Sequence, residues 1–297
     1  MDPLVFLLVA GAAVLHVTWN VLLKTAGEPL QAAAIGLTAG AIIVCPVALV
    51  IWLGDGRPEI PALTLGLSVV SGTLEAAYFA FLASAYRRGD LSIVYPIARG
   101  SAPLLAVLIG VIVLGERLGP VGSIGVAALL VGILALQRPW QYLRAAGREG
   151  GGAAGFALLT GVTIAAYSAV DSVAVKGTTA LTYAGLIWVS GIVFLWIFYA
   201  VYRLRRAAEE TTWSAATIRR AAAGGVITLG AYLMILAAYR VAPLTAVAPL
   251  RESAIVLASG WGALRLREAD DRTDAARRLG AAALVLLGAL LLAFGQP

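Results

Sequence analysis

The stretch Leu91-Ser92-Ile93-Val94-Tyr95-Pro96 occurs a second time, in altered form, as Leu244-Thr245-Ala246-Val247-Ala248-Pro249. A neighbouring landmark returns at the same offset, since Ala85-Tyr86-Arg87 recurs as Ala238-Tyr239-Arg240. Each copy contains five apolar segments. An odd number of segments makes the second copy enter a membrane from the opposite side, so the repeat predicts the inverted duplication that is typical of secondary transporters.

Composition restricts the class of protein. Hydrophobic residues make up 61% of the 297 residues and charged residues only 13%, which is too apolar for a single soluble core. We therefore predict an all-α integral membrane protein. The net charge of +6 does not indicate nucleic-acid binding, because the basic residues lie in short loops, where they set topology and contact lipid headgroups. The single cysteine, Cys45, excludes an internal disulfide and a thiolate metal site.

Ten apolar stretches approach the roughly 20 residues needed to cross a bilayer. The expected transmembrane helices are residues 4–24, 31–53, 62–86, 91–114, 119–137, 153–175, 181–202, 219–239, 244–264 and 277–294. The first has no basic leader, which favours a retained helix over a signal peptide. We expect a first five-helix repeat at 1–137, a flexible cytoplasmic linker at 138–152, and a second, inverted five-helix repeat at 153–297.

The distribution of Lys and Arg predicts the orientation. The loops on the side of the termini hold four of them: Arg57, Arg117, Lys176 and Arg240. The other side holds sixteen: Lys24, Arg87, Arg88, Arg138, Arg144, Arg148, Arg203, Arg205, Arg206, Arg219, Arg220, Arg265, Arg267, Arg272, Arg277 and Arg278. Because basic loops are retained in the cytoplasm, we expect a bacterial-type inner (plasma) membrane protein with both termini outside.

Ionisable side chains inside the expected spans are the first candidates for function. They are His16, Glu75, Arg99, Asp171, Arg251 and Glu252. Each charge at a helix centre costs roughly 2.5–3.5 kcal/mol on insertion scales, so such residues normally face a cavity. We interpret Glu75, Asp171 and Glu252 as proton-coupling candidates; for Glu75 the alternative is a neutral side chain hydrogen-bonded between helices. Arg99 and Arg251 are candidate contacts for a substrate carboxylate or phosphate. Arg251 should point toward Asp171 or Glu75, since neighbours on a helix diverge by about 100°.

Two prolines mark the fourth and ninth spans. Pro96 precedes Arg99, and Pro249 precedes Glu252, by the same number of residues. Proline frees a backbone carbonyl that a cavity or a neighbouring helix must satisfy. Because the repeats are inverted, Arg99 and Glu252 are predicted to face each other near the midplane. The alternative is a static salt bridge that only locks the two halves together.

Polar residues on the first span form a stripe. His16, Asn20 and Lys24 are spaced by four residues, with Trp19 alongside, so they share one helix face. We count His16, Trp19 and Asn20 as substrate-binding candidates. A packed, hydrogen-bonded role for His16 and a helix-joining role for Asn20 stay open, and Lys24 is expected to reach the headgroups. No metal site is predicted, because the chain has no second histidine.

Aromatic residues fall into two groups, according to whether they lie one helical turn from a charged residue in the sequence. Tyr78 and Tyr95 lie one helical turn from a charged residue and join the substrate-binding candidates. Trp188 and Trp196 are expected to be lipid anchors or packing residues. Gly36 and Gly40 form a GxxxG pattern that is typical of close helix packing.

Two motifs carry a family resemblance. The runs Trp19-Asn20-Val21-Leu22-Leu23-Lys24 and Leu114-Gly115-Glu116-Arg117-Leu118 resemble the EamA domain of the drug/metabolite transporter superfamily. Both halves share the resemblance, with departures: Glu116 returns as Glu268 without the preceding glycine, and Asp171-Ser172 replaces Trp19-Asn20. The resemblance implies two helical bundles around a central cavity and export of small metabolites, commonly amino acids, often coupled to protons.

We therefore expect a secondary transporter, with membrane lipids and a small-molecule substrate as its partners and with no cofactor. It would export a small polar or amphiphilic metabolite by alternating access. Motifs for a metalloprotease, a serine hydrolase or a phosphate loop are absent from the sequence, which argues against a membrane enzyme. A translocator of a lipid or lipid-linked headgroup, and a sensor that binds a ligand without moving it, remain alternatives. The sequence predicts no oligomeric state.

Overall fold

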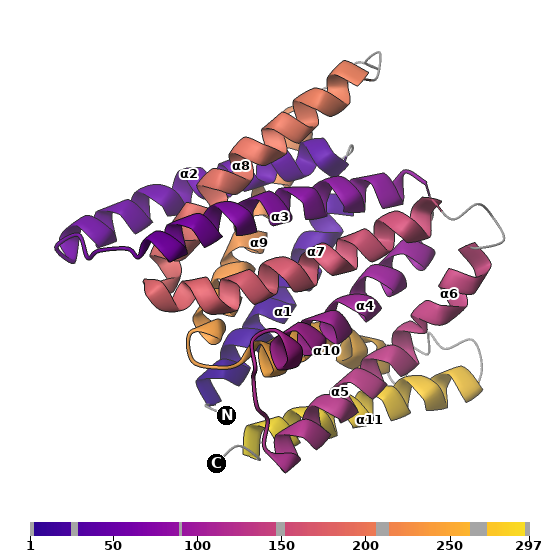
Figure 1. Ribbon diagram of the computed structural model, residues 1–297. Helices are drawn as coiled ribbons and strands as arrows, with labels where there is room; N and C mark the ends of the chain where they lie inside the picture. The colour runs from indigo at the N-terminus through magenta and orange to yellow at the C-terminus, as the bar shows by residue number, and fades with distance from the viewer. Residues whose placement is uncertain are drawn as a thin grey trace.

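The computed structural model describes residues 3–24, 29–88, 91–146, 152–205, 214–261 and 272–294. These residues form helices joined by short connections, with no strand among them, as the composition predicts. The helices are α1 (Pro3–Lys24), α2 (Pro29–Gly54), α3 (Ala62–Tyr86), α4 (Leu91–Ile112), α5 (Pro120–Gln137), α6 (Pro139–Ala146), α7 (Gly152–Ala174), α8 (Ala180–Arg205), α9 (Ala215–Tyr239), α10 (Leu244–Trp261) and α11 (Arg272–Phe294), with a 3-10 turn η1 at Val175–Gly177 (Figure 1).

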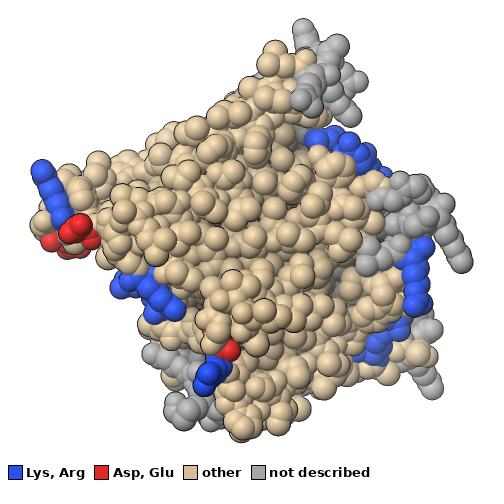
Figure 2. All heavy atoms as spheres, viewed as in Figure 1, with Lys and Arg blue, Asp and Glu red and all other residues tan. Residues whose placement is uncertain are grey.

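The exterior of the bundle is that of a multi-pass membrane protein. Five described helices are long and apolar enough to cross a membrane: Leu30–Gly54, Ala62–Tyr86, Gly152–Gly177, Ala180–Leu204 and Ala215–Tyr239. Shorter apolar helices cover Pro3–His16, Ile97–Ile112 and Pro120–Leu136. Figure 2 shows charged side chains toward the borders of the visible face and a broad central band without them. Such a band suits contact with lipid tails.

The long helices run back and forth between two ends of the bundle. At the first, which we call the termini end, the connection after α4 meets the start of α10, because Leu244 donates its N–H to Glu116 at 2.8 Å. At the second, the linker end, α3 finishes beside the start of α7, where the Arg88 guanidinium lies 4.4 Å from the ring centre of Phe156. α5 also finishes there, since Arg277 of α11 donates to its last carbonyls.

Glycines bring helices from the two halves of the chain into close contact. A Cβ on Gly225 of α9 would lie only 2.0 Å from the carbonyl oxygen of Gly36 on α2. The corresponding contact joins α3 to α8, where a Cβ on Gly72 would lie 2.7 Å from the carbonyl oxygen of Ile187. A Cβ on Gly40 would likewise meet Leu229, so both glycines of the GxxxG pattern lie at a close helix contact, as predicted, and the partner is α9.

We expect Gly225→Ala to destabilise the protein by about 1–3 kcal/mol, because the new methyl group meets backbone that no rotamer change can move. Gly66→Ala on α3 is the matched control, since nothing lies within 4 Å of its added Cβ. The measurement is the midpoint of thermal unfolding in detergent. Equal midpoints for the two variants would show that α2 and α9 do not touch at Gly225.

The segment between the halves differs in part from the expectation of a flexible linker. Residues 139–146 form α6, which packs against α4 and α7. Proline at the first position suits a helix start, and the following Gln, Leu, Arg and Ala are good helix formers. An interpretation based on the glycines alone was therefore wrong for these eight residues. Residues 147–151 lie outside the described part of the chain.

Candidate functional site

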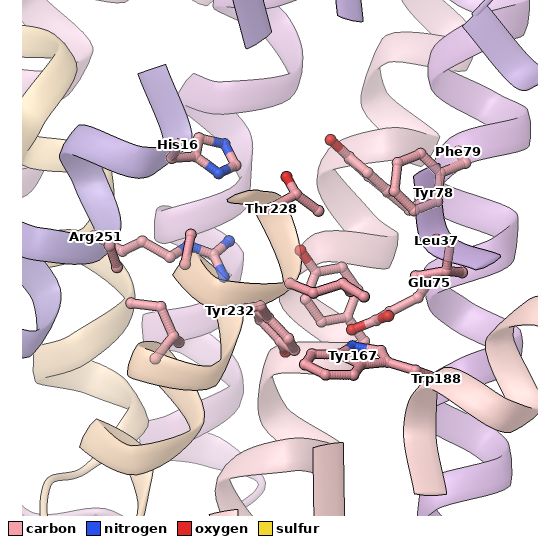
Figure 3. A pocket seen from close by; sticks show the side chains of 14 residues that line it. His16, Leu37, Glu75, Tyr78, Phe79, Tyr167, Trp188, Thr228, Tyr232 and Arg251 are labelled. Carbon is pink, nitrogen blue, oxygen red and sulfur yellow. The ribbon is translucent and has the colours of Figure 1, made fainter. Parts of the chain in front are cut away.

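A cavity of about 60 Å³ lies among the helices, with room for roughly four water molecules. α1, α2, α3, α7, α8, α9 and α10 all contribute to its walls. Its polar and aromatic lining residues are His16, Glu75, Tyr78, Phe79, Tyr167, Trp188, Thr228, Tyr232 and Arg251 (Figure 3). Both halves of the chain therefore build one cavity, and three of the ionisable residues expected within the spans line it: His16, Glu75 and Arg251.

One wall combines a carboxylate with aromatic rings. Glu75 is 7% exposed, and Figure 3 shows its carboxylate directed into the cavity. No hydrogen bond or ion pair joins this carboxylate to any residue that the structure describes. Tyr78 and Tyr167 meet edge to face beside it, with ring centres 6.2 Å apart. Such rings can contact a cation through their faces as well as hydrogen-bond through their hydroxyl groups.

The opposite wall is basic. Figure 3 shows His16 of α1 and the guanidinium of Arg251 of α10 on the side of the cavity away from Glu75. The expected direction of Arg251 toward Glu75 agrees with this placement. Its Nε also donates to the neighbouring Glu252 at 3.2 Å, a contact that we did not predict. The cavity thus has a basic wall and, facing it, a wall that carries a carboxyl group.

A buried network stands behind the basic wall. Arg99 of α4 donates from Nη1 to Oε1 of Glu252 at 2.9 Å, which confirms that these two residues face each other. The same oxygen accepts from Arg251, so one carboxylate serves two guanidinium groups. Arg99 also donates from Nη2 to Nε2 of His16. Since a guanidinium can only donate, Nε2 of His16 accepts, and the ring proton resides on Nδ1.

Asp171 lies apart from this network. It is fully buried on α7 and accepts from the hydroxyl of Tyr183 at 2.8 Å and from the hydroxyl of Tyr232. Tyr232 lines the cavity, whereas Asp171 is not among the lining residues. The carboxylate therefore joins α7, α8 and α9 from behind Tyr232.

The sequence comparison agrees with this architecture. Residues 3–137 match the model of the EamA-like transporter family. A membrane transporter is the function that this family implies.

A structural comparison covers nearly the whole chain. A solved structure titled "Crystal structure of protein" aligns over 98% of this chain and 99% of its own, with a TM-score of 0.70 and 18% identity. At this identity the likeness shows a shared fold. Among curated proteins, none matches the sequence.

The cavity includes residues that we had not proposed for a substrate site. They include Phe79, Tyr167, Thr228 and Tyr232, together with Trp188, for which we had expected a lipid-anchor or packing role. A signal for two of them was present: the offset that pairs Arg99 with Glu252 also pairs Glu75 with Thr228 and Phe79 with Tyr232. The side chains of Trp19, Asn20 and Tyr95 lie outside the described part of the structure.

The two tryptophans of α8 have different positions in the bundle. Trp188 is fully buried and lines the cavity, so the lipid-anchor interpretation is wrong for it. Anchors belong near helix ends, and its place well inside a long apolar run was a signal against that role. Trp196 donates its ring N–H to Thr38 of α2 at 3.0 Å, as a packing residue does.

Proposed function

We propose that this protein is a secondary transporter that exports a small polar or amphiphilic metabolite, such as an amino acid, by alternating access. The observation that carries the proposal is the network of Arg99, Glu252 and Arg251, because it joins charged residues of both halves beside a shared cavity. Charges buried in a membrane bundle are costly and normally belong to a transport pathway.

The proposal treats α1–α5 and α7–α11 as two inverted five-helix halves. Helix contacts support this division, because they keep the same pattern when the halves are exchanged. α3 packs on α7 and α8, and its counterpart α9 packs on α1 and α2. In addition, α2 packs on its counterpart α8, α4 on α10, and α5 on α11. Alternating access then consists of one half rocking against the other around the cavity.

The charges of the cavity favour a substrate that carries both signs. Glu252 offers one negative charge to two guanidinium groups, so the basic wall keeps an excess positive charge at Arg251. We assign Arg251, with His16, to the acidic group of the substrate, and Tyr78 to its polar body. Arg99 is held by Glu252 and would act on the substrate through this network.

We place the coupling proton on a carboxylate of the cavity. Of the three candidates, Glu75 lines the cavity, Asp171 lies behind Tyr232, and Glu252 is engaged by two arginines. Glu75 is therefore the residue that a proton and a substrate can both reach. We further propose a bacterial-type inner membrane with the termini end outside, because the linker end carries most of the basic residues.

A thermal-stabilisation screen of the purified protein tests the proposal. Amino acids are expected to raise the unfolding midpoint, since a ligand that binds the folded state at 100 times its Kd stabilises it by about 2.7 kcal/mol. The matched carboxylic acids and amines, each with only one charge, should stabilise it less. A response confined to glycerophosphate headgroups would instead favour the translocator of lipids, and no response to any zwitterion would contradict the proposal.

A further inference from the structure

The first half of the chain caps a helix of the second half. Glu116, in the connection after α4, accepts the N–H of Leu244 at 2.8 Å through Oε1 and the N–H of Thr245 at 2.9 Å through Oε2. These are the first two residues of α10, and N–H groups at a helix start have no partner within the helix. A carboxylate there also interacts favourably with the helix dipole.

The backbone around Glu116 favours this contact. Gly115 has φ +65°, a left-handed conformation in which glycine carries no steric penalty, and the N–H of Glu116 closes the end of α4 on the carbonyl of Gly110 at 2.9 Å. A Cβ on Gly110 would lie 2.6 Å from Cγ2 of Thr245 and 2.8 Å from Oε2 of Glu116. Gly110 therefore allows the start of α10 and the carboxylate to meet against α4.

The cap and the cavity share one helix. Arg251 and Glu252 lie about two turns along α10 from Leu244. α4 and α10 are thus joined at two places, by the buried ion pair of Arg99 with Glu252 and by Glu116 at the termini end. A displacement of the start of α10 would move the basic wall of the cavity.

The cavity extends toward the other end of the bundle. A smaller pocket shares Leu37, Phe79 and Thr228 with it and reaches Ala32 and Arg220, which lie within the first two turns of α2 and α9 at the linker end. In the part of the chain that the structure describes, the pockets therefore lead toward the linker end, and Glu116 bridges the termini end.

We propose that Glu116 is a latch that keeps the termini end of the cavity closed and releases α10 when the cavity opens to that side. The proposal rests on alternating access as the function. Glu116 suits a reversible contact, because it is only partly buried and water can replace it at the N–H groups. Release of Glu252 from Arg99, by contrast, would strand a charge at a buried site.

Sidedness of cysteine labelling tests the latch. In a Cys45→Ser background, Thr228→Cys places one thiol on the wall that both pockets share. A membrane-impermeant maleimide is applied to vesicles that hold the protein in either orientation. The accessibility of a tag placed after Pro297 shows which orientation each preparation has. With Glu116 present we expect faster labelling from the linker side. Glu116→Ala should raise the rate from the termini side on the order of tenfold, as expected for loss of a helix cap.

A second variant perturbs the latch without changing any charge. Gly110→Ala should also raise termini-side labelling, because its methyl group displaces Glu116 and Thr245. Glu116→Gln, which keeps one amide acceptor, should give an intermediate rate. Glu59→Ala and Arg117→Ala, which remove exposed charges at the same end, should leave both rates unchanged.

The outcomes separate a latch from a structural cap. If Glu116→Ala and Gly110→Ala lower the unfolding midpoint but leave the ratio of the two labelling rates unchanged, Glu116 only caps α10 and the proposal is wrong. If Glu116→Ala does not fold, Gly110→Ala and Glu116→Gln decide the question. The labelling needs no substrate, so it can fail or succeed independently of the ligand screen.

Discussion

Glu252→Ala is expected to destabilise the protein by about 3–5 kcal/mol, and Arg99→Ala by a smaller amount, about 1–3 kcal/mol. Both side chains are buried, with exposed fractions of 3% for Glu252 and 6% for Arg99. Loss of Glu252 removes the acceptor that Arg99 and Arg251 share. Loss of Arg99 leaves Glu252 paired with Arg251, so less uncompensated charge remains in the bundle.

The measurement is the free energy of unfolding in mixed micelles for both single variants and the double variant. Because the residues are in contact, the loss in Arg99→Ala/Glu252→Ala should be smaller than the sum of the single losses. Arg240→Ala and Glu59→Ala remove exposed charges of the same types and should each change stability by less than about 0.5 kcal/mol. Additive losses, or a larger loss for Arg99→Ala than for Glu252→Ala, would contradict this account.

The charge swap Arg99→Glu/Glu252→Arg separates a structural pair from a functional one. It restores the pair but places an arginine beside Arg251 and a carboxylate beside His16. We therefore expect recovery of only part of the lost stability. Transport should stay impaired, because the excess positive charge no longer lies where the substrate is proposed to bind. Full transport by the swapped protein would show that the pair only holds the two halves together and has no role in transport.

Sequence reasoning found most helices because each is a long apolar run that ends at charged or glycine-rich loops. The expected span 62–86 coincides with α3, for example. It missed α6 because a helix of eight residues with mixed polarity gives no long apolar run. The start of α9 was also placed four residues too late, at 219, because the apolar run does not extend before Arg219. The helix begins at Ala215, where Ser214 caps it by accepting the N–H of Thr217.

Within the site, the repeat was the strongest guide. It paired Arg99 with Glu252, and the same offset would have led from Glu75 to Thr228. The repeat could not predict the partners of Asp171, because the first half has no carboxylate at the corresponding position. Its bond with Tyr183 depends on how α8 folds back on α7 after the turn at η1, which is a matter of packing and not of sequence period.

Glu75→Gln is expected to abolish substrate-driven pH change in proteoliposomes while leaving the protein folded. Gln has the shape of Glu, and Glu75 makes no hydrogen bond or ion pair with a described residue, so the free energy of unfolding should change by less than about 1 kcal/mol. Amino acids that stabilise the parent protein should still stabilise the variant through Arg251, although less strongly if their ammonium group approaches Glu75.

Asp171→Asn is the matched control, since it neutralises a second buried carboxylate on a facing helix. Its side chain accepts two tyrosine hydroxyl groups and does not line the cavity, so we expect a stability loss of about 1–3 kcal/mol with proton coupling retained. The pair of variants assigns the coupling site. If Asp171→Asn stops the pH change and Glu75→Gln does not, the proton is carried behind Tyr232 and Glu75 serves only the substrate. If neither variant alters proton movement while Glu252→Gln does, Glu252 carries the proton. Its carboxylate must then separate from Arg99 and Arg251 in each transport cycle.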